Sequence, residues 1–226
     1  MRTSPGGARA HAEDRAALGR RARRIAALLA KEYPDARCAL DHRGPFELLV
    51  ATILAAQCTD ERVNQVTPAL FARFPDAAAM AAADPAELES LVRSTGFFRA
   101  KAKSIRGASA ALALRFAPGF PSRMEDLLTL TGVGRKTANV VLGTCFGEPS
   151  IIVDTHVRRV SQRLALATSD DPDEIERQLQ DLLPPGGWTG FSHQLTFHGR
   201  RRCRARKPDC GSCALAGLCP SRSPRG

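Results

Sequence analysis

The sequence predicts an all-α protein. Apolar residues recur at helical spacing through most of its 226 residues, and the only β-branched run is Ile151-Ile152-Val153. Prolines and capping residues interrupt this pattern often enough to indicate about ten helices. With 43% hydrophobic residues the chain can bury a sizeable core and fold alone, so we expect a monomer.

Start and stop signals delimit the helices of the N-terminal half. Proline at the first helical position and a side-chain oxygen just before it are the signals used, because both fit the unpaired amides of a first turn. The predicted helices lie at about 13–32, from Pro45, after Thr59, from Asp84-Pro85 to about residue 94, and at about 99–116.

The second half begins with a predicted capping box, Ser122 to Glu125, which opens a short helix ending at Leu130. A tight turn and another helix follow. Asp154 stands where the N-cap of the next helix is expected, and Pro172 opens one more. A final helix at about 189–202 leads into a cysteine-rich segment.

The charge indicates a polyanionic partner. The formal net charge is +10, and the stretch 200–207 holds six basic residues and no acidic one. Lysine and arginine that neutralise phosphates release counterions, so nucleic acid is the expected partner, with an arginine-rich solvated surface as the alternative. No apolar run is long enough to cross a bilayer, so we expect a soluble cytoplasmic protein with residues 1–15 as a flexible basic tail.

Four of the seven cysteines are crowded near the C-terminal end, and the odd total argues against a disulfide framework. Their spacing is C-x6-C-x2-C-x5-C, formed by Cys203, Cys210, Cys213 and Cys219. Four thiols this close bind a metal or oxidise. Structural zinc is one candidate, but zinc sites more often pair two CxxC hairpins, and only Cys210 and Cys213 form such a pair here.

The turn Thr131-Gly132-Val133-Gly134 separates two predicted helices and can present its amides to a phosphate. Val133 would anchor this turn in the core. An ordinary helix-to-helix turn is the alternative. Lys136 follows in the first turn of the next helix, where it can contact a phosphate or act as a nucleophile if it is partly buried and neutral. Asp154 can cap its helix, serve the chemistry, or do both.

The stretch from Leu130 to Leu142 resembles the helix-hairpin-helix of the DNA glycosylase superfamily; it contains the sequence TGVGRKTANVV. Together with Val153-Asp154-Thr155-His156 and the cysteine segment, it resembles the endonuclease III family from about Arg20 to Cys219. This resemblance implies two helical lobes. One would comprise residues 42–152 with the hairpin, and the other residues 16–41 plus 153–226 with a C-terminal iron-sulfur loop.

The resemblance also implies the chemistry. Lys136 would form a Schiff base with the sugar and Asp154 would be its essential partner, in a bifunctional DNA glycosylase and AP lyase of base excision repair. Oxidised pyrimidines in double-stranded DNA would be the substrates, and β-elimination would cut the strand 3′ to the abasic site. A monofunctional glycosylase that shares hairpin and cluster is the nearer alternative, although that branch usually lacks the lysine. A non-catalytic DNA-binding module with a metal-stapled basic loop is the more distant one.

The remaining expectations concern cofactor and DNA contacts. By resemblance, the four cysteines would hold a [4Fe-4S] cluster, and the protein would associate with the nucleoid. Extrusion of the damaged nucleotide leaves a gap in the base stack. The resemblance implies that Gln57 and Phe97 fill this gap. Phe97 departs from the aliphatic residue typical of its position. The expected DNA contacts are Gln57, Phe97, Gly132, Val133, Gly134, Arg135, Arg204, Arg206 and Lys207.

Overall fold

The computed structural model describes residues 14–223, and every regular element within this range is helical, so the all-α prediction is confirmed. The α-helices are α1 (Arg15–Glu32), α2 (Pro45–Leu54), α3 (Asp60–Arg73), α4 (Ala77–Ala81), α5 (Pro85–Val92), α6 (Phe98–Arg115), α7 (Met124–Leu128), α8 (Arg135–Cys145), α9 (Thr155–Arg163), α10 (Pro172–Gln180) and α11 (Trp188–Arg201). Short 3₁₀ turns are η1 (Arg93–Thr95), η2 (Pro185–Gly187) and η3 (Ala216–Leu218).

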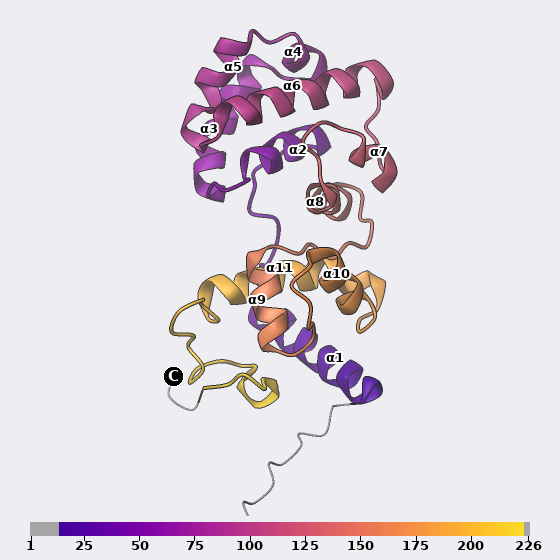
Figure 1. The fold of residues 1–226 in the computed structure, drawn as a ribbon, viewed down its shortest axis with the longest axis vertical. Helices are drawn as coiled ribbons and strands as arrows, with labels where there is room; N and C mark the ends of the chain where they lie inside the picture. Colours follow the sequence, from indigo (N-terminus) through magenta and orange to yellow (C-terminus); the bar gives the residue numbers. More distant parts are fainter. Residues whose placement is uncertain (1–13, 224–226) are drawn as a thin grey trace, which may run out of the picture.

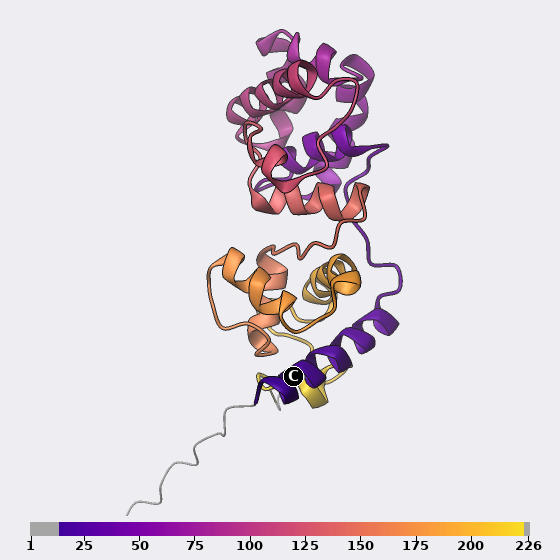
Figure 2. The same ribbon diagram turned by 90° about the vertical axis from the view of Figure 1, so that its right-hand side faces the viewer.

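The helices form two lobes, each around its own apolar core (Figure 1). The first lobe contains α2 to α8, and its core includes Leu48, Leu70 and Ile105. The second contains α1 and α9 to α11, around residues such as Ile25 and Leu195. The two lobes are also distinct in the view turned by 90° (Figure 2). In this view α1 lies on the side of the second lobe that faces away from the first lobe.

The β-branched run Ile151-Ile152-Val153 lies in one of the two segments that join the lobes. It forms no strand. Side chains alternate across an extended backbone, and here Ile152 packs into the first core whereas Ile151 and Val153 pack into the second. The run therefore fixes the lobes to each other through its side chains.

The predicted helix starts are confirmed where a short polar side chain caps the helix. Thr59 accepts a hydrogen bond from the amide of Arg62, and Asp84 accepts one from the amide of Glu87. The predicted capping box at Ser122 is wrong. The N-cap of α7 is Arg123, which has no side-chain hydrogen bond to the helix, and Glu125 forms an ion pair with Arg123 rather than capping.

The structure also differs from the prediction at the start of α1 and at α4. Residues 1–13 of the expected basic tail lie outside the described residues, while Asp14 caps α1 by accepting from the amide of Ala17 at 2.7 Å, and Arg15 begins the helix. The helix α4 was not predicted, because five residues rich in alanine carry no apolar periodicity. Asp76 starts it as N-cap.

Candidate active site and DNA interface

The turn between α7 and α8 packs tightly on α6. Gly132 has φ +77°, and a Cβ at this position would lie 2.5 Å from the Cβ of Ser104. Glycine is therefore required for both conformation and space. Val133 is 8% exposed and belongs to the first core, as expected, and its amide donates to the carbonyl of Leu130 at 3.1 Å.

The first turn of α8 has no side-chain cap. Gly134 is the N-cap of α8 and supplies no side-chain acceptor, so the first-turn amides lack the partner that a serine or aspartate would offer. A Cβ at Gly134 would meet nothing within 4 Å. The positive end of the helix dipole adds to these amides, and the combination suits a phosphate oxygen.

Lys136 is the second residue of α8 and its side chain is exposed rather than partly buried as expected. Within residues 14–223 its amine forms no ion pair, so no internal partner holds it. If the N-terminus of α8 binds a phosphate of a DNA strand, the amine of Lys136 can reach a sugar of that strand.

Asp154 is the half-buried N-cap of α9. Its Oδ1 accepts from the amides of His156 at 2.8 Å and Val157 at 2.7 Å, and its Oδ2 accepts from Thr196 Oγ1 at 3.3 Å. One oxygen is thus fixed by the helix, while the other retains a lone pair for a second partner. The capping and the chemical interpretations of this residue are compatible.

The catalytic candidates come from different lobes, and α8 connects them. Lys136 and Asn139 are three residues apart, so they share a face of α8. Asn139 is 3% exposed, and its Nδ2 donates to the carbonyl of Ile151 at 3.1 Å. Since Ile151 lies three residues before Asp154, the face of α8 that carries Lys136 contacts the segment that leads into Asp154.

Arg135, expected at the DNA interface, is engaged within the protein. Its Nε and Nη2 donate to the two carboxylate oxygens of Glu176 at 2.8 and 2.9 Å, and Glu176 also accepts from Asn139 at 3.0 Å. Glu176 belongs to α10 of the second lobe and is 4% exposed. This bidentate pair, which holds the pKa of Arg135 above its usual value, joins the start of α8 to the second lobe.

Two histidines flank Asp154. His156 belongs to the stretch Val153-Asp154-Thr155-His156, but no role was predicted for it, and His193 was not singled out in the sequence. Burial lowers the pKa of His193 and of His156, and in both cases the charge of Asp154 acts in the opposite direction. Neutral imidazoles leave the carboxylate without a cationic partner on that side. His193 and Thr196 belong to no motif noted in the sequence, and the packing of α11 on α9 brings them here.

Gln57 and Phe97, the expected gap-filling residues, share an unusual backbone. Their φ angles are +54° and +46°, a left-handed conformation that costs a non-glycine residue about 1–3 kcal/mol. Both side chains are exposed, and at 67% exposed Phe97 is not part of the apolar core. Two strained, projecting residues thus occupy neighbouring loops of the first lobe.

The four C-terminal cysteines line one cavity of about 180 Å³ in the second lobe. Within residues 14–223, no group of three or more His, Cys, Asp or Glu side chains is arranged to hold a metal ion. The chemistry of the cavity nevertheless fits a larger sulfur-ligated group, since the four thiols surround a space rather than a point. Two nitrogen atoms contact this sulfur set: Arg163 Nη1 donates to Cys203 Sγ at 3.3 Å, and His198 Nε2 lies 3.7 Å from Cys213 Sγ.

The basic stretch 200–207 divides into paired and unpaired residues. Arg200, Arg201 and Arg202 form ion pairs with Asp60, Asp35 and Asp209 respectively. The other three, Arg204, Arg206 and Lys207, are exposed and have no ion pair in the part of the chain that the structure describes. They lie between the first two cysteines and are available for phosphates.

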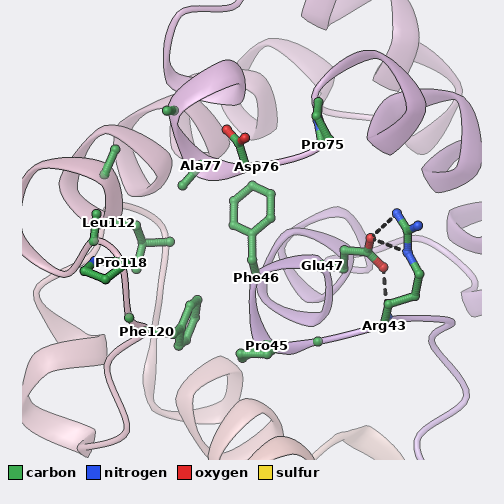
Figure 3. A pocket seen from close by; sticks show the side chains of 15 residues that line it. Arg43, Pro45, Phe46, Glu47, Pro75, Asp76, Ala77, Leu112, Pro118 and Phe120 are labelled. Carbon is green, nitrogen blue, oxygen red and sulfur yellow. Dashed lines mark hydrogen bonds and ion pairs between the residues drawn. The ribbon is translucent and has the colours of Figure 1, made fainter.

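A broad hollow of about 620 Å³ lies elsewhere, on the first lobe, and Phe46, Leu112 and Phe120 contribute to its walls (Figure 3). The ion pair between Arg43 and Glu47 stands at its edge. None of the expected site residues lines it. None of the helices among the described residues is long and apolar enough to span a membrane.

The comparisons with known proteins agree with this geometry. The family model of the HhH-GPD superfamily of base excision DNA repair proteins matches residues 50–185. Endonuclease III of Synechocystis sp. is 57% identical over 89% of this chain and 92% of the relative, and endonuclease III of Bacillus subtilis is 43% identical over 83% and 86%. The chain belongs to the endonuclease III family.

Solved structures of endonuclease III have the same fold. A non-covalent complex of an endonuclease III with DNA aligns with a TM-score of 0.86 at 44% identity, covering 90% of this chain and 95% of that one. A trapped covalent intermediate of endonuclease III with DNA aligns with a TM-score of 0.86 at 43% identity, covering 90% and 96%. The helix-hairpin-helix architecture of the endonuclease III family is thus that of this chain.

Proposed function

We propose that Lys136 and Asp154 form the catalytic pair with which this chain acts as a bifunctional DNA glycosylase and AP lyase of base excision repair. Membership of the endonuclease III family supports the activity, and damaged double-stranded DNA is the substrate. The observation that carries the residue assignment is the contact of Asn139 with Ile151, which brings the Lys136 face of α8 against the segment entering Asp154.

The reaction uses the amine of Lys136 as nucleophile. Its lone pair forms a bond to the sugar C1′ while the bond from C1′ to the base breaks, and the base leaves with that electron pair and a proton. The carboxylate of Asp154 stabilises the positive charge that develops on the sugar and accepts the proton released by the amine. The bond from C1′ to the ring oxygen O4′ then breaks, the proton held by Asp154 passes to that oxygen, and the lone pair of the nitrogen forms the double bond of the Schiff base. The Schiff base acidifies C2′, and loss of its proton expels the 3′ phosphate.

DNA is held from both lobes. The hairpin amides at Gly132 and Gly134 grip the backbone near the lesion, while Val133 keeps the turn in the core. Arg204, Arg206 and Lys207 contact phosphates further along the duplex. Arg135 serves by holding α8 against Glu176 rather than by touching DNA.

Nucleotide extrusion uses Gln57 and Phe97. Their exposed side chains enter the space that the extruded nucleotide leaves, and their left-handed backbones fix the direction in which they project. Phenylalanine presents a flat apolar ring to the bases on either side of the gap, where it can stack. We propose oxidised pyrimidines such as thymine glycol as the preferred lesions.

The cysteine cavity fits a [4Fe-4S] cluster, which would be held by Cys203, Cys210, Cys213 and Cys219 and would cross-link the C-terminal loop. The chain prepares the site with donors, since Arg163 bonds Cys203 Sγ and also the carbonyls of Arg204 and Ala205 at 2.7 and 2.9 Å. Arg163 thereby fixes the loop that presents the basic residues to phosphates.

Several broader expectations belong to the same proposal. The lobe bounds are residues 42–152 for the first lobe and 16–41 plus 153–226 for the second, and the protein acts as a monomer. We place it in the cytoplasm, associated with the nucleoid, where its substrate is found. The apolar cores of the two lobes support this division of the chain.

Single-turnover kinetics test the residue assignment. Wild type, Lys136→Gln and Asp154→Asn are each incubated in excess with a duplex carrying one thymine glycol, and base release and strand cleavage are followed separately. We expect wild type to do both and Lys136→Gln to do neither. Base release without strand cleavage by wild type would instead identify a monofunctional glycosylase.

A further inference from the structure

Lys101 is a buried lysine that bridges two separate segments of the first lobe. It lies in the first turn of α6 and is 5% exposed. Its Nζ donates to the carbonyl of Leu54 and to the carbonyl of Thr95, both at 2.7 Å. A single amine therefore fixes the distance between the end of α2 and the end of η1.

The two carbonyls stand at the base of the two loops that carry the projecting side chains. Leu54 is the last residue of α2, three before Gln57, and Thr95 is the last residue of η1, two before Phe97. Gln57 and Phe97 both have positive φ angles. Lys101 thus joins the backbone segments that lead into Gln57 and Phe97.

The contacts of Lys101 indicate that its amine is needed as a hydrogen-bond donor, and not only its carbon chain for packing. The surroundings of Lys101 on α6 include Ala102 and Ile105, which are 2% and 0% exposed, and burial in this apolar setting lowers the pKa of the amine. An unpaired amine would be costly here. The carbonyl of Leu54 ends a helix and so lacks an intrahelical partner, and it attracts a cation through the helix dipole.

We propose that Lys101 is a positioning residue for nucleotide extrusion, which holds the Gln57 and Phe97 loops at a fixed separation so that both side chains enter the base stack together. This inference rests on the proposed function, in which Gln57 and Phe97 fill the gap. Lys101 touches neither DNA nor the reacting atoms. Lys101 favours extrusion because it orders the two loops in advance, so that little conformational entropy is lost when their side chains enter the duplex.

Two substrates separate extrusion from chemistry. One duplex carries a thymine glycol, which must be unstacked and removed, and the other carries a preformed abasic site, which has no base to unstack. For Lys101→Met we expect the single-turnover rate of base release to fall about tenfold and strand cleavage at the abasic site to fall at most about twofold. Lys103→Met, an exposed lysine of the same helix, is the matched control and should keep both rates.

The ratio of the two rates remains informative even if Lys101→Met folds poorly, because both are measured on the same preparation and a smaller folded fraction cancels. A double-mutant cycle with Phe97→Ala adds a second test. If Lys101 acts through the loop, Lys101→Met should have little further effect on base release once Phe97 is truncated. Equal losses in both reactions, or effects that multiply in the double variant, would overturn the proposal.

The same experiment distinguishes this inference from the proposed function. Wild type that cleaves the abasic duplex, with Lys136→Gln inactive, upholds the catalytic assignment whatever Lys101→Met does. Wild type that cleaves neither duplex overturns both the catalytic assignment and the role of Lys101.

Discussion

Replacing Arg135 by methionine removes the partner of a buried carboxylate between the lobes. The side chain of Arg135 is 41% exposed and that of Glu176 is 5% exposed, so the cost falls on the acid left behind. Glu176 would retain only the amide donors of Asn139 and Gln180. Breaking a buried ion pair costs about 3–5 kcal/mol, and the partial exposure of Arg135 places this variant near the lower limit, about 3 kcal/mol.

A loss of about 3 kcal/mol corresponds to a fall of about 6–12 °C in Tm for a chain of this size. Thermal unfolding followed by circular dichroism measures it. Arg177→Met is the matched control, because Arg177 lies on the same helix as Glu176 and its own ion pair with Glu174 is at the surface. This control should change the stability by about 0.5 kcal/mol or less.

The salt dependence of DNA binding distinguishes this role from a phosphate contact. If Arg135 is held by Glu176, the slope of log K against log salt should be unchanged in Arg135→Met once the folded fraction is accounted for. A Tm within about 1 °C of wild type, combined with a slope reduced by about 0.9, would refute the interlobe role and restore Arg135 to the DNA interface.

Three further experiments test the hairpin packing, the basic stretch and the buried histidine beside Asp154. Gly132→Ala combines left-handed strain with a collision against Ser104, so we expect a loss of about 3 kcal/mol in urea unfolding, and an unchanged midpoint would contradict the packing. Arg206→Gln should reduce the salt slope of DNA binding by about 0.9, whereas Arg201→Gln, whose guanidinium is paired, should reduce it less; equal slopes would contradict the division of the basic stretch. Burial lowers the pKa of His193, so below about pH 6.5 the unfolded chain binds more protons than the folded one and stability falls as the pH drops from 7 to 5. His193→Gln should weaken that dependence, and an identical pH profile would show that another group causes it.

The sequence predicted elements whose signals are local. Thr59, Asp84 and Asp154 cap helices in the structure because a short polar side chain can reach an amide two or three residues ahead in any context. The same rule failed at Ser122, because α7 begins one residue later than the motif requires. The β-branched run Ile151-Ile152-Val153 was correctly kept out of the helices, although its division between two cores was not foreseen.

The supporting contacts could not be predicted, since they join residues that are far apart in sequence. Lys101 looks like any surface lysine of an amphipathic helix, and only the fold brings the carbonyl of Leu54 to its amine. Glu176 pairs with Arg135 across 41 positions and has no motif. The sequence therefore indicated the groups that would react, while the structure supplied the groups that hold them in place.

Borohydride trapping shows whether Lys136 forms a Schiff base with the sugar. A duplex with one thymine glycol is incubated with wild type or Lys136→Gln, and borohydride is added to reduce any Schiff base to a stable covalent bond. We expect a covalent complex with wild type, attached at Lys136, and none with Lys136→Gln. A complex of equal yield with Lys136→Gln, or strand cleavage by wild type with no trapped complex, would contradict this expectation.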